Sequence, residues 1–121
     1  VTPTSGSPPA GLAASVAPLE WNKTKINVID TPGMGNFLSD ARSALRVSEA
    51  AVVVIDAVSG VQVSTEKVWG YADEFQLPRL IVLNRLDRER ASVDRAVTSM
   101  RASRCGSLWA TSAPWALRSV R

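Results

Sequence analysis

Two short segments of the chain combine side chains that could bind a nucleotide. The first is Asp30-Thr31-Pro32-Gly33, and the second is Asn84-Arg85-Leu86-Asp87. A carboxylate such as Asp30 can hold Mg²⁺ through water, and Gly33 lets a backbone N–H approach a phosphate with no Cβ in the way. In the second segment the amide can bond N7 or the six-position oxygen of a purine. The carboxylate can accept the two N–H bonds that guanine offers at N1 and N2.

The residues that precede these segments predict strands. K-I-N-V-I-D ends at Asp30, the β-branched run Ala50–Ala57 contains Asp56, and the run Leu80–Leu83 leads into Asn84. In open α/β sheets ligands bind beyond the carboxyl ends of the strands. Because three predicted strands end in polar residues, we expect a binding site at that edge of the sheet.

Hydrophobic periodicity supplies the rest of the expected architecture. The continuous run at 50–57 predicts a strand buried on both faces, Asn36 is a candidate cap for one helix, and Ser64 or Thr65 for the next. Strands that alternate with helices predict an α/β layered sheet with right-handed crossovers. The expected strands lie near 16–21, 25–30, 50–56 and 79–84, and the expected helices near 37–48, 64–76 and 88–100.

Composition limits the classes of function. With 121 residues and 45% apolar side chains, the chain suits one globular domain. It has no histidine and a single cysteine, Cys105, which excludes Ser-His and Cys-His catalysis, an internal disulfide and a cysteine metal cage. No apolar run approaches the 18 residues of a membrane span. These features favour a cytoplasmic protein.

The two ends differ from the middle. The head, 1–15, is rich in Pro, Ser and Gly and predicts irregular or disordered chain, and the patterned part is 16–100. The tail, 101–121, has no Lys, Asp or Glu and is rich in Arg, Trp and Ser. It accounts for much of the net charge of +3. A basic tail can bind nucleic acid, but its composition is also that of GC-rich coding sequence in the wrong frame. We therefore hypothesise a fragment or a frame-disrupted product.

The two segments, 54 residues apart, and the sequence between them resemble translational GTPases, most of all elongation factor G. The resemblance covers about residues 15–100 and includes A-P-L-E-W-N-K-T-K-I-N-V-I-D-T-P-G and L-P-R-L-I-V-L-N-R-L-D-R. It implies an incomplete P-loop GTPase domain, with a mostly parallel sheet and flanking helices. It also implies GTP or GDP with Mg²⁺ as ligands, and the ribosome, through its RNA and proteins, as partner. Neither DNA nor a membrane is implied.

The resemblance also implies roles for single residues. Asp30 would be the water-mediated Mg²⁺ ligand and the Gly33 N–H would meet the γ-phosphate, with Thr31, Pro32 and Met34 completing that GTP-binding segment. Asn84 and Asp87 would select guanine, flanking Arg85 and Leu86. Arg85 stands where the family usually has lysine, and the two are not interchangeable at a packed site.

Two departures concern the phosphates. The phosphate loop G-x-x-x-x-G-K-[ST] is not found, and Gly6–Gly11 lacks its Lys and hydroxyl and contains Pro8 and Pro9. Met34 occupies the place where the family usually carries the histidine that positions the attacking water. We therefore assign no catalytic residue, and hydrolysis stays open. The weak S-A match at Thr111-Ser112-Ala113 stands too close to the other motifs.

Alternatives remain at this point. The segment from Asp30 to Gly35 before a helix, with Asp56 at the next strand end, mimics a Rossmann dinucleotide-binding unit, although Leu38 replaces the third glycine. The other alternative is a non-enzymatic piece, either a remnant without a nucleotide site or a ribosome-contacting module. Asp30 could bond its own loop, and Asn84 and Asp87 could merely cap the next helix. Without the strand that feeds the phosphate loop, its two neighbours would either pair directly or keep open edges.

Overall fold

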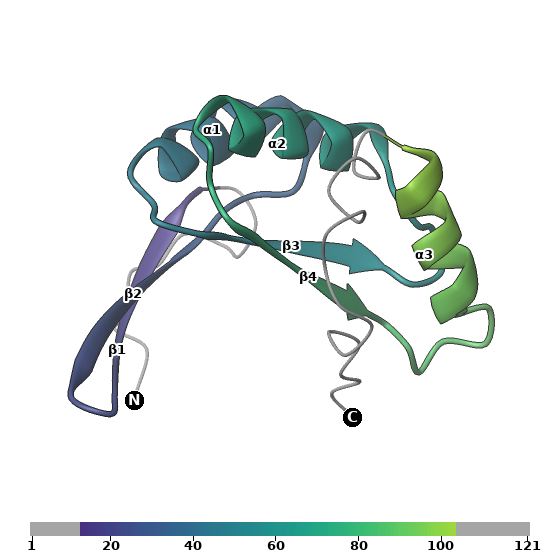
Figure 1. The fold of residues 1–121 in the computed structure, drawn as a ribbon, viewed down its shortest axis with the longest axis horizontal. Coiled ribbons are helices and arrows are strands. Elements are labelled where there is room, and N and C mark those ends of the chain that lie inside the picture. Colours follow the sequence, from purple (N-terminus) through teal and green to yellow (C-terminus); the bar gives the residue numbers. More distant parts are fainter. Residues whose placement is uncertain (1–12, 104–121) are drawn as a thin grey trace. The chain divides into compact units, whose positions relative to one another are not determined.

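The computed structural model describes residues 13–103, which form an α/β arrangement (Figure 1). The predicted order of elements is confirmed, and each strand boundary lies within one residue of its expected place. The elements are β1 (Ser15–Trp21), β2 (Thr24–Asp30), the short 3-10 helix η1 (Gly35–Phe37), α1 (Leu38–Arg46), β3 (Ala51–Asp56), α2 (Val63–Glu74), β4 (Arg79–Asn84) and α3 (Val93–Ala102).

The chain divides into two compact units. The first contains β1, β2, α1 and the C-terminal part of α2, and the second contains β3 from Val52, the first part of α2, β4 from Leu80, and α3. The strands form two separate two-stranded sheets, β1–β2 and β3–β4. Within the described residues β2 is thus paired with β1, and β3 with β4.

In the first unit β1 and β2 form an antiparallel hairpin, with a register that runs from Ser15 opposite Asp30 to Trp21 opposite Thr24. Asn22 and Lys23 make the turn with φ of 48° and 63°, as a tight hairpin turn requires. Because side chains alternate along a strand, the register places five apolar residues on one face: Ala17, Leu19, Trp21, Ile26 and Val28.

The helices of the first unit are joined through Arg42. Its Nη2 lies 2.5 Å from Glu74 Oε1 on α2, and its guanidinium lies 5.7 Å from the ring centre of Tyr71 and 5.8 Å from that of Phe75. The hydrogen bond and the charge of Glu74 raise the pKa of Arg42. One face of α1 is buried through Leu38, Ala41 and Ala44.

The second unit is built on parallel strands and a buried apolar cluster. Ala51 N–H donates to Pro78 C=O and Ala57 N–H to Asn84 C=O, both at 2.9 Å and with the same residue offset, so β3 and β4 run parallel. The buried cluster consists of Val53, Ile55, Trp69 and Met100. Four partly buried apolar side chains pack against it: Val61, Ile81, Leu83 and Val97.

The expectation that β3 is buried on both faces is wrong for the described residues. Val52 and Val54 are 62% and 58% exposed, and Leu80 and Val82 on β4 are exposed as well. Burial alternates along β3 because its core cluster lies on one face only. The β-branched run therefore reports strand propensity here rather than two covered faces.

One predicted helix start and one predicted helix cap are corrected. The helix expected near 88–100 begins at Val93, because Ser92 Oγ accepts the Arg95 N–H at 3.3 Å and caps it. Asn36 lies inside η1, and Phe37 precedes α1 with no side-chain cap.

The predicted cap of α2 also differs. Thr65 Oγ1 accepts a hydrogen bond from Gln62 N–H, just before the helix begins at Val63. Thr65 therefore reaches back from inside the first turn instead of preceding the helix. Among the described residues no helix is long and apolar enough to cross a membrane.

Candidate guanine-nucleotide site

The Asp30–Met34 segment follows the hairpin of the first unit. Asp30 ends β2 with its side chain exposed, and within the described residues that side chain accepts no hydrogen bond from the chain. The alternative that it bonds its own loop is therefore not observed. Pro32 is buried. Gly33 has open space where a Cβ would stand, so its backbone is accessible to a ligand. Met34 is 60% exposed, and its C=O accepts the Phe37 N–H at 2.9 Å.

The Asn84–Asp87 segment begins at the carboxyl end of β4 in the second unit. Asn84 Oδ1 accepts the Arg85 N–H at 2.8 Å, which leaves the amide NH₂ of Asn84 as a donor. Arg85 has a φ of 61°, a left-handed conformation uncommon for a side chain of this size. Leu86 and Asp87 are exposed. Neither Asn84 nor Asp87 caps α3, since Ser92 does, so the helix-cap alternative is wrong.

Both ends of the loop between β4 and α3 are fixed to one residue of the loop after β3. The Ala57 N–H donates to Asn84 C=O at 2.9 Å, and Ala57 C=O accepts the Ser92 N–H at 3.2 Å. Ala57 is 1% exposed. Water therefore competes little for these bonds, and the loop of Arg85–Ala91 starts and ends at fixed points.

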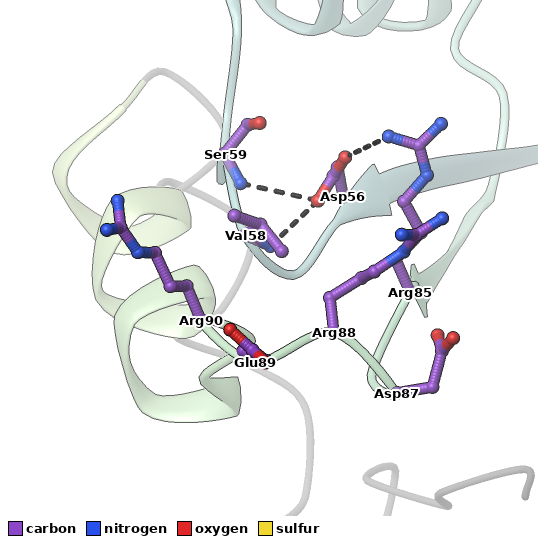
Figure 2. Close-up of a pocket in the computed structure, with 8 residues that line it drawn as sticks. All are labelled: Asp56, Val58, Ser59, Arg85, Asp87, Arg88, Glu89 and Arg90. Carbon is purple, nitrogen blue, oxygen red and sulfur yellow. Dashed lines mark hydrogen bonds and ion pairs between the residues drawn. The ribbon is translucent and has the colours of Figure 1, made fainter.

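Asp56 connects the same two loops through its side chain (Figure 2). Its Oδ1 accepts the N–H groups of Val58 at 2.7 Å and Ser59 at 3.3 Å, and its Oδ2 lies 2.9 Å from Nη1 of Arg85. The Val58 hydrogen bond is the largest cause that lowers the pKa of Asp56; Ser59 and Arg85 lower it further and partial burial opposes them. Gly60, with a φ of 69°, completes the turn by donating to Asp56 C=O.

These two loops line an open hollow of about 720 Å³, a size usual for small-molecule sites. Figure 2 shows Arg85 directed to Asp56, and Asp87 apart from that pair. From the sequence, Asp56 is expected at a strand end and enters only the Rossmann alternative. D-A-V-S-G is a detectable signal, since Asp often bonds the N–H two residues later in a turn. The lining residues are Asp56, Val58, Ser59, Arg85, Asp87, Arg88, Glu89 and Arg90.

The structure thus gathers part of the predicted site. Arg85 and Asp87 line one hollow in the second unit, next to Asn84 and Leu86 in sequence, whereas the Asp30–Met34 segment belongs to the first unit. In the described part of the chain no three His, Cys, Asp or Glu side chains come together as a metal site. A metal at Asp30 would take its other ligands from water and a bound nucleotide.

Residues 10–112 match the family described as the elongation factor Tu GTP binding domain. The chain belongs to this family. The match decides against the Rossmann alternative, and it identifies the chain as a segment of a translational GTPase domain.

Named relatives of this GTP binding domain are translation factors. The chain is 38% identical over 92 residues to an elongation factor G-like protein of Thermotoga maritima, and the match covers 76% of this chain and 14% of that protein. It is 48% identical over 86 residues to a mitochondrial ribosome-releasing factor 2 of Lodderomyces elongisporus, covering 71% and 10%. The chain therefore spans about a tenth to a seventh of the length of these curated relatives.

Two solved structures have a similar fold over about three quarters of this chain. A crystal structure of a protein from Thermus thermophilus superimposes with a TM-score of 0.68 at 34% identity, covering 74% of this chain and 14% of that chain. Translation elongation factor SelB of Methanococcus maripaludis, in complex with the GTP analogue GppNHp, gives 0.64 at 18% identity, covering 77% and 22%. The second likeness supports the GTP binding domain fold alone.

Proposed function

We propose that Asn84 and Asp87 read the guanine base in a translational GTPase that acts on the ribosome, and that Asp30–Met34 forms part of its Mg²⁺ and γ-phosphate site. One observation carries the proposal. The loop that begins with Asn84 is held at both ends by buried Ala57, at the carboxyl edge of the parallel pair β3–β4. This is where α/β sheets bind ligands.

The chemistry of the two side chains suits guanine. Because Asn84 Oδ1 already accepts the Arg85 N–H, its NH₂ group remains as a donor, which matches the acceptors N7 and O6 of a purine. The exposed Asp87 carboxylate accepts two parallel N–H bonds, and among the common bases guanine presents such a pair at N1 and N2. Adenine offers no matching pair.

The residues of the first segment fit a magnesium ion in part. Asp30 supplies one exposed carboxylate oxygen donor, and Mg²⁺ typically binds one or two carboxylates, several waters and the substrate phosphates. When bound, the ion neutralises charge on the phosphate oxygens. Gly33 leaves its backbone open to a phosphate. Met34 holds no proton acceptor that could orient the attacking water, so this segment positions ligands without assigning a catalytic base.

Affinity in this chain is expected to be low. The phosphates carry most of the charge of a nucleotide, and the G-x-x-x-x-G-K-[ST] motif that would bind them is not in these 121 residues. Base reading alone selects a ligand without binding it tightly. We therefore expect the chain to bind GDP weaker than micromolar, which is a free energy smaller in magnitude than about 8.2 kcal/mol.

Calorimetry and NMR together test the proposal. The purified chain is titrated with GDP and with ADP in the presence of Mg²⁺, and the amide shifts of Asn84 and Asp87 are followed. We expect weak binding with a preference for GDP at these amides. Equal responses to GDP and ADP would contradict base reading. Sub-micromolar GDP binding that Asp87→Ala abolishes would instead reveal a phosphate site outside the segments assigned above.

A further inference from the structure

We propose that Asp56 is a positioning residue for the loop that carries Asn84 and Asp87, acting through the guanidinium of Arg85. The inference rests on the proposed function for the purpose of the loop, but the linkage itself concerns the chain without ligand. Asp56 reads no base and contacts no assigned ligand position. It sets where the base-reading loop begins.

The Asp56 carboxylate is divided between two tasks. Oδ1 accepts from Val58 N–H at 2.7 Å and from Ser59 N–H, which fixes the carboxylate in its own turn. Oδ2 remains for Arg85 Nη1 at 2.9 Å. Because the turn already holds the acceptor, forming the ion pair orders one side chain instead of two, and that reduces the entropic cost that weakens most surface pairs.

Arg85 transmits this restraint to the loop. Its N–H donates to Asn84 Oδ1, its C=O accepts the Arg88 N–H at 3.2 Å, and its backbone holds a φ of 61°. A guanidinium fixed at one end and a backbone bonded at the other define the turn from which Asn84 and Asp87 project. A lysine at this position would present a point charge, whereas arginine offers a planar fork.

Other charged side chains lie near Asp56 and Arg85, but none of those described replaces Arg85 as the ion-pair partner of Asp56. The Asp56 side chain is 22% exposed and that of Arg85 is 62% exposed. Arg88, Arg90, Asp87 and Glu89 line the same hollow, yet within the described residues the ion pair of Asp56 is with Arg85. The selected partner is the one whose backbone forms the turn.

The test uses hydrogen exchange and NMR on the full chain without nucleotide. Asp56→Asn keeps an oxygen for Val58 and Ser59 but removes the charge that holds Arg85. We expect the Arg88 and Ala91 amides to exchange about two- to fivefold faster, the range for a pair open to solvent, while the Ile55 amide is unchanged. Arg85→Gln should match it, and the double variant should add nothing further. Glu89→Gln, in the same hollow, is the control and should leave the rates as they are.

Rescue separates positioning from a structural role. Arg85→Lys keeps a cation and should restore most of the protection that Arg85→Gln loses. Additive effects in the double variant, or no change with Asp56→Asn, would overturn the proposal. A GDP titration of the same samples reports separately on function. If exchange behaves as expected while GDP and ADP act alike, the positioning role stands and the proposed base reading fails.

Discussion

The β1–β2 hairpin and the β3–β4 pair are both two-stranded, but they support their site segments differently. In the hairpin the cross-strand partners Leu19 and Ile26 are 44% and 40% exposed. In the β3–β4 pair Val53 and Ile55 are 6% and 1% exposed and pack with residues of α2 and α3. The Asn84–Asp87 loop is therefore built on a packed core, while Asp30 follows strands stabilised mainly by their own ladder.

The difference indicates which of the two segments of the proposed nucleotide site is held by packing within the described residues. A two-stranded hairpin is marginally stable without a packed face, so the position of Asp30 depends on what covers its apolar face. The Asn84–Asp87 loop, proposed to read the base, has a buried anchor at Ala57 and a side-chain anchor at Asp56. We expect base selection to be measurable even where phosphate binding is weak.

Truncation of a core residue gives the largest expected effect and tests the contrast directly. Ile55→Ala should lower the free energy of unfolding by about 2–5 kcal/mol, because it removes buried methyl groups and leaves a cavity. Ile26→Ala in the half-exposed hairpin face is the matched control and should cost clearly less. Urea unfolding measures both. If the two substitutions cost the same, the claimed asymmetry between the two strand pairs is wrong.

The turn after β3 gives the next effect. Gly60→Ala should destabilise the protein by about 1–2 kcal/mol, because alanine is strained in the left-handed region. Gly60 lies there with a φ of 69°, and the added Cβ of alanine would stand 2.9 Å from Ser99 Oγ. Gly70→Ala on α2 meets nothing within 4 Å and should stabilise by about 0.5–1 kcal/mol. Thermal unfolding of both variants gives the signs, and a stable Gly60→Ala protein would argue against a rigid turn at this site.

The cap of α3 has a smaller effect. Ser92→Ala should cost about 1 kcal/mol, because the Arg95 N–H loses its acceptor at the helix start. Asn36→Ala, at the cap expected from sequence, should change stability by no more than about 0.5 kcal/mol. Chemical denaturation compares the two. A larger loss at Asn36 would mean that the helix of the first unit begins differently.

The smallest effect is the pH response of Asp56. Its pKa is lowered in the folded chain, first by the Val58 hydrogen bond, so its stabilising contribution is complete above the ordinary aspartate value of 3.8. The contribution is lost as the pH falls through the lowered value. The stability difference between the wild-type chain and Asp56→Asn should therefore be constant near neutral pH and shrink in acid. Both proteins keep the other charged groups that line the hollow, which are Asp87, Glu89, Arg88 and Arg90. A stability difference that persists unchanged in acid would therefore show that Asp56 makes no such contribution.

Local features made most of the fold predictable. β-branched runs, the Asn22-Lys23 turn and the D-T-P-G and N-R-L-D segments are readable within a few residues of sequence. The link between Asp56 and Arg85 joins residues 29 apart and exists only once β3 and β4 pair. The start of α3 was misplaced for a related reason. Residues 88–91 have helix-compatible side chains, but the loop is tied to Ala57 until Ser92.

The exposed face of β3 shows a second limit of sequence reasoning. A run of valines indicates a strand and favours burial, yet whether a face is covered depends on what packs on it. Val52 and Val54 satisfy the strand pattern and remain exposed among the described residues. The base-reading roles of Asn84 and Asp87 came from their motif and the family resemblance, and they stay a proposal until a nucleotide is bound.

The most direct measurement of base reading compares GDP with XDP on the wild-type chain and on Asp87→Asn, by NMR titration at millimolar nucleotide. A carboxylate accepts the N1–H and N2–H of guanine, whereas an amide both donates and accepts, which suits the two-position oxygen of xanthine. The wild-type chain should prefer GDP, and Asp87→Asn should prefer XDP, with a change in ratio of about tenfold or more, equal to about 1.4 kcal/mol. An unchanged preference in a folded Asp87→Asn chain would contradict the role of Asp87 as the guanine-reading residue.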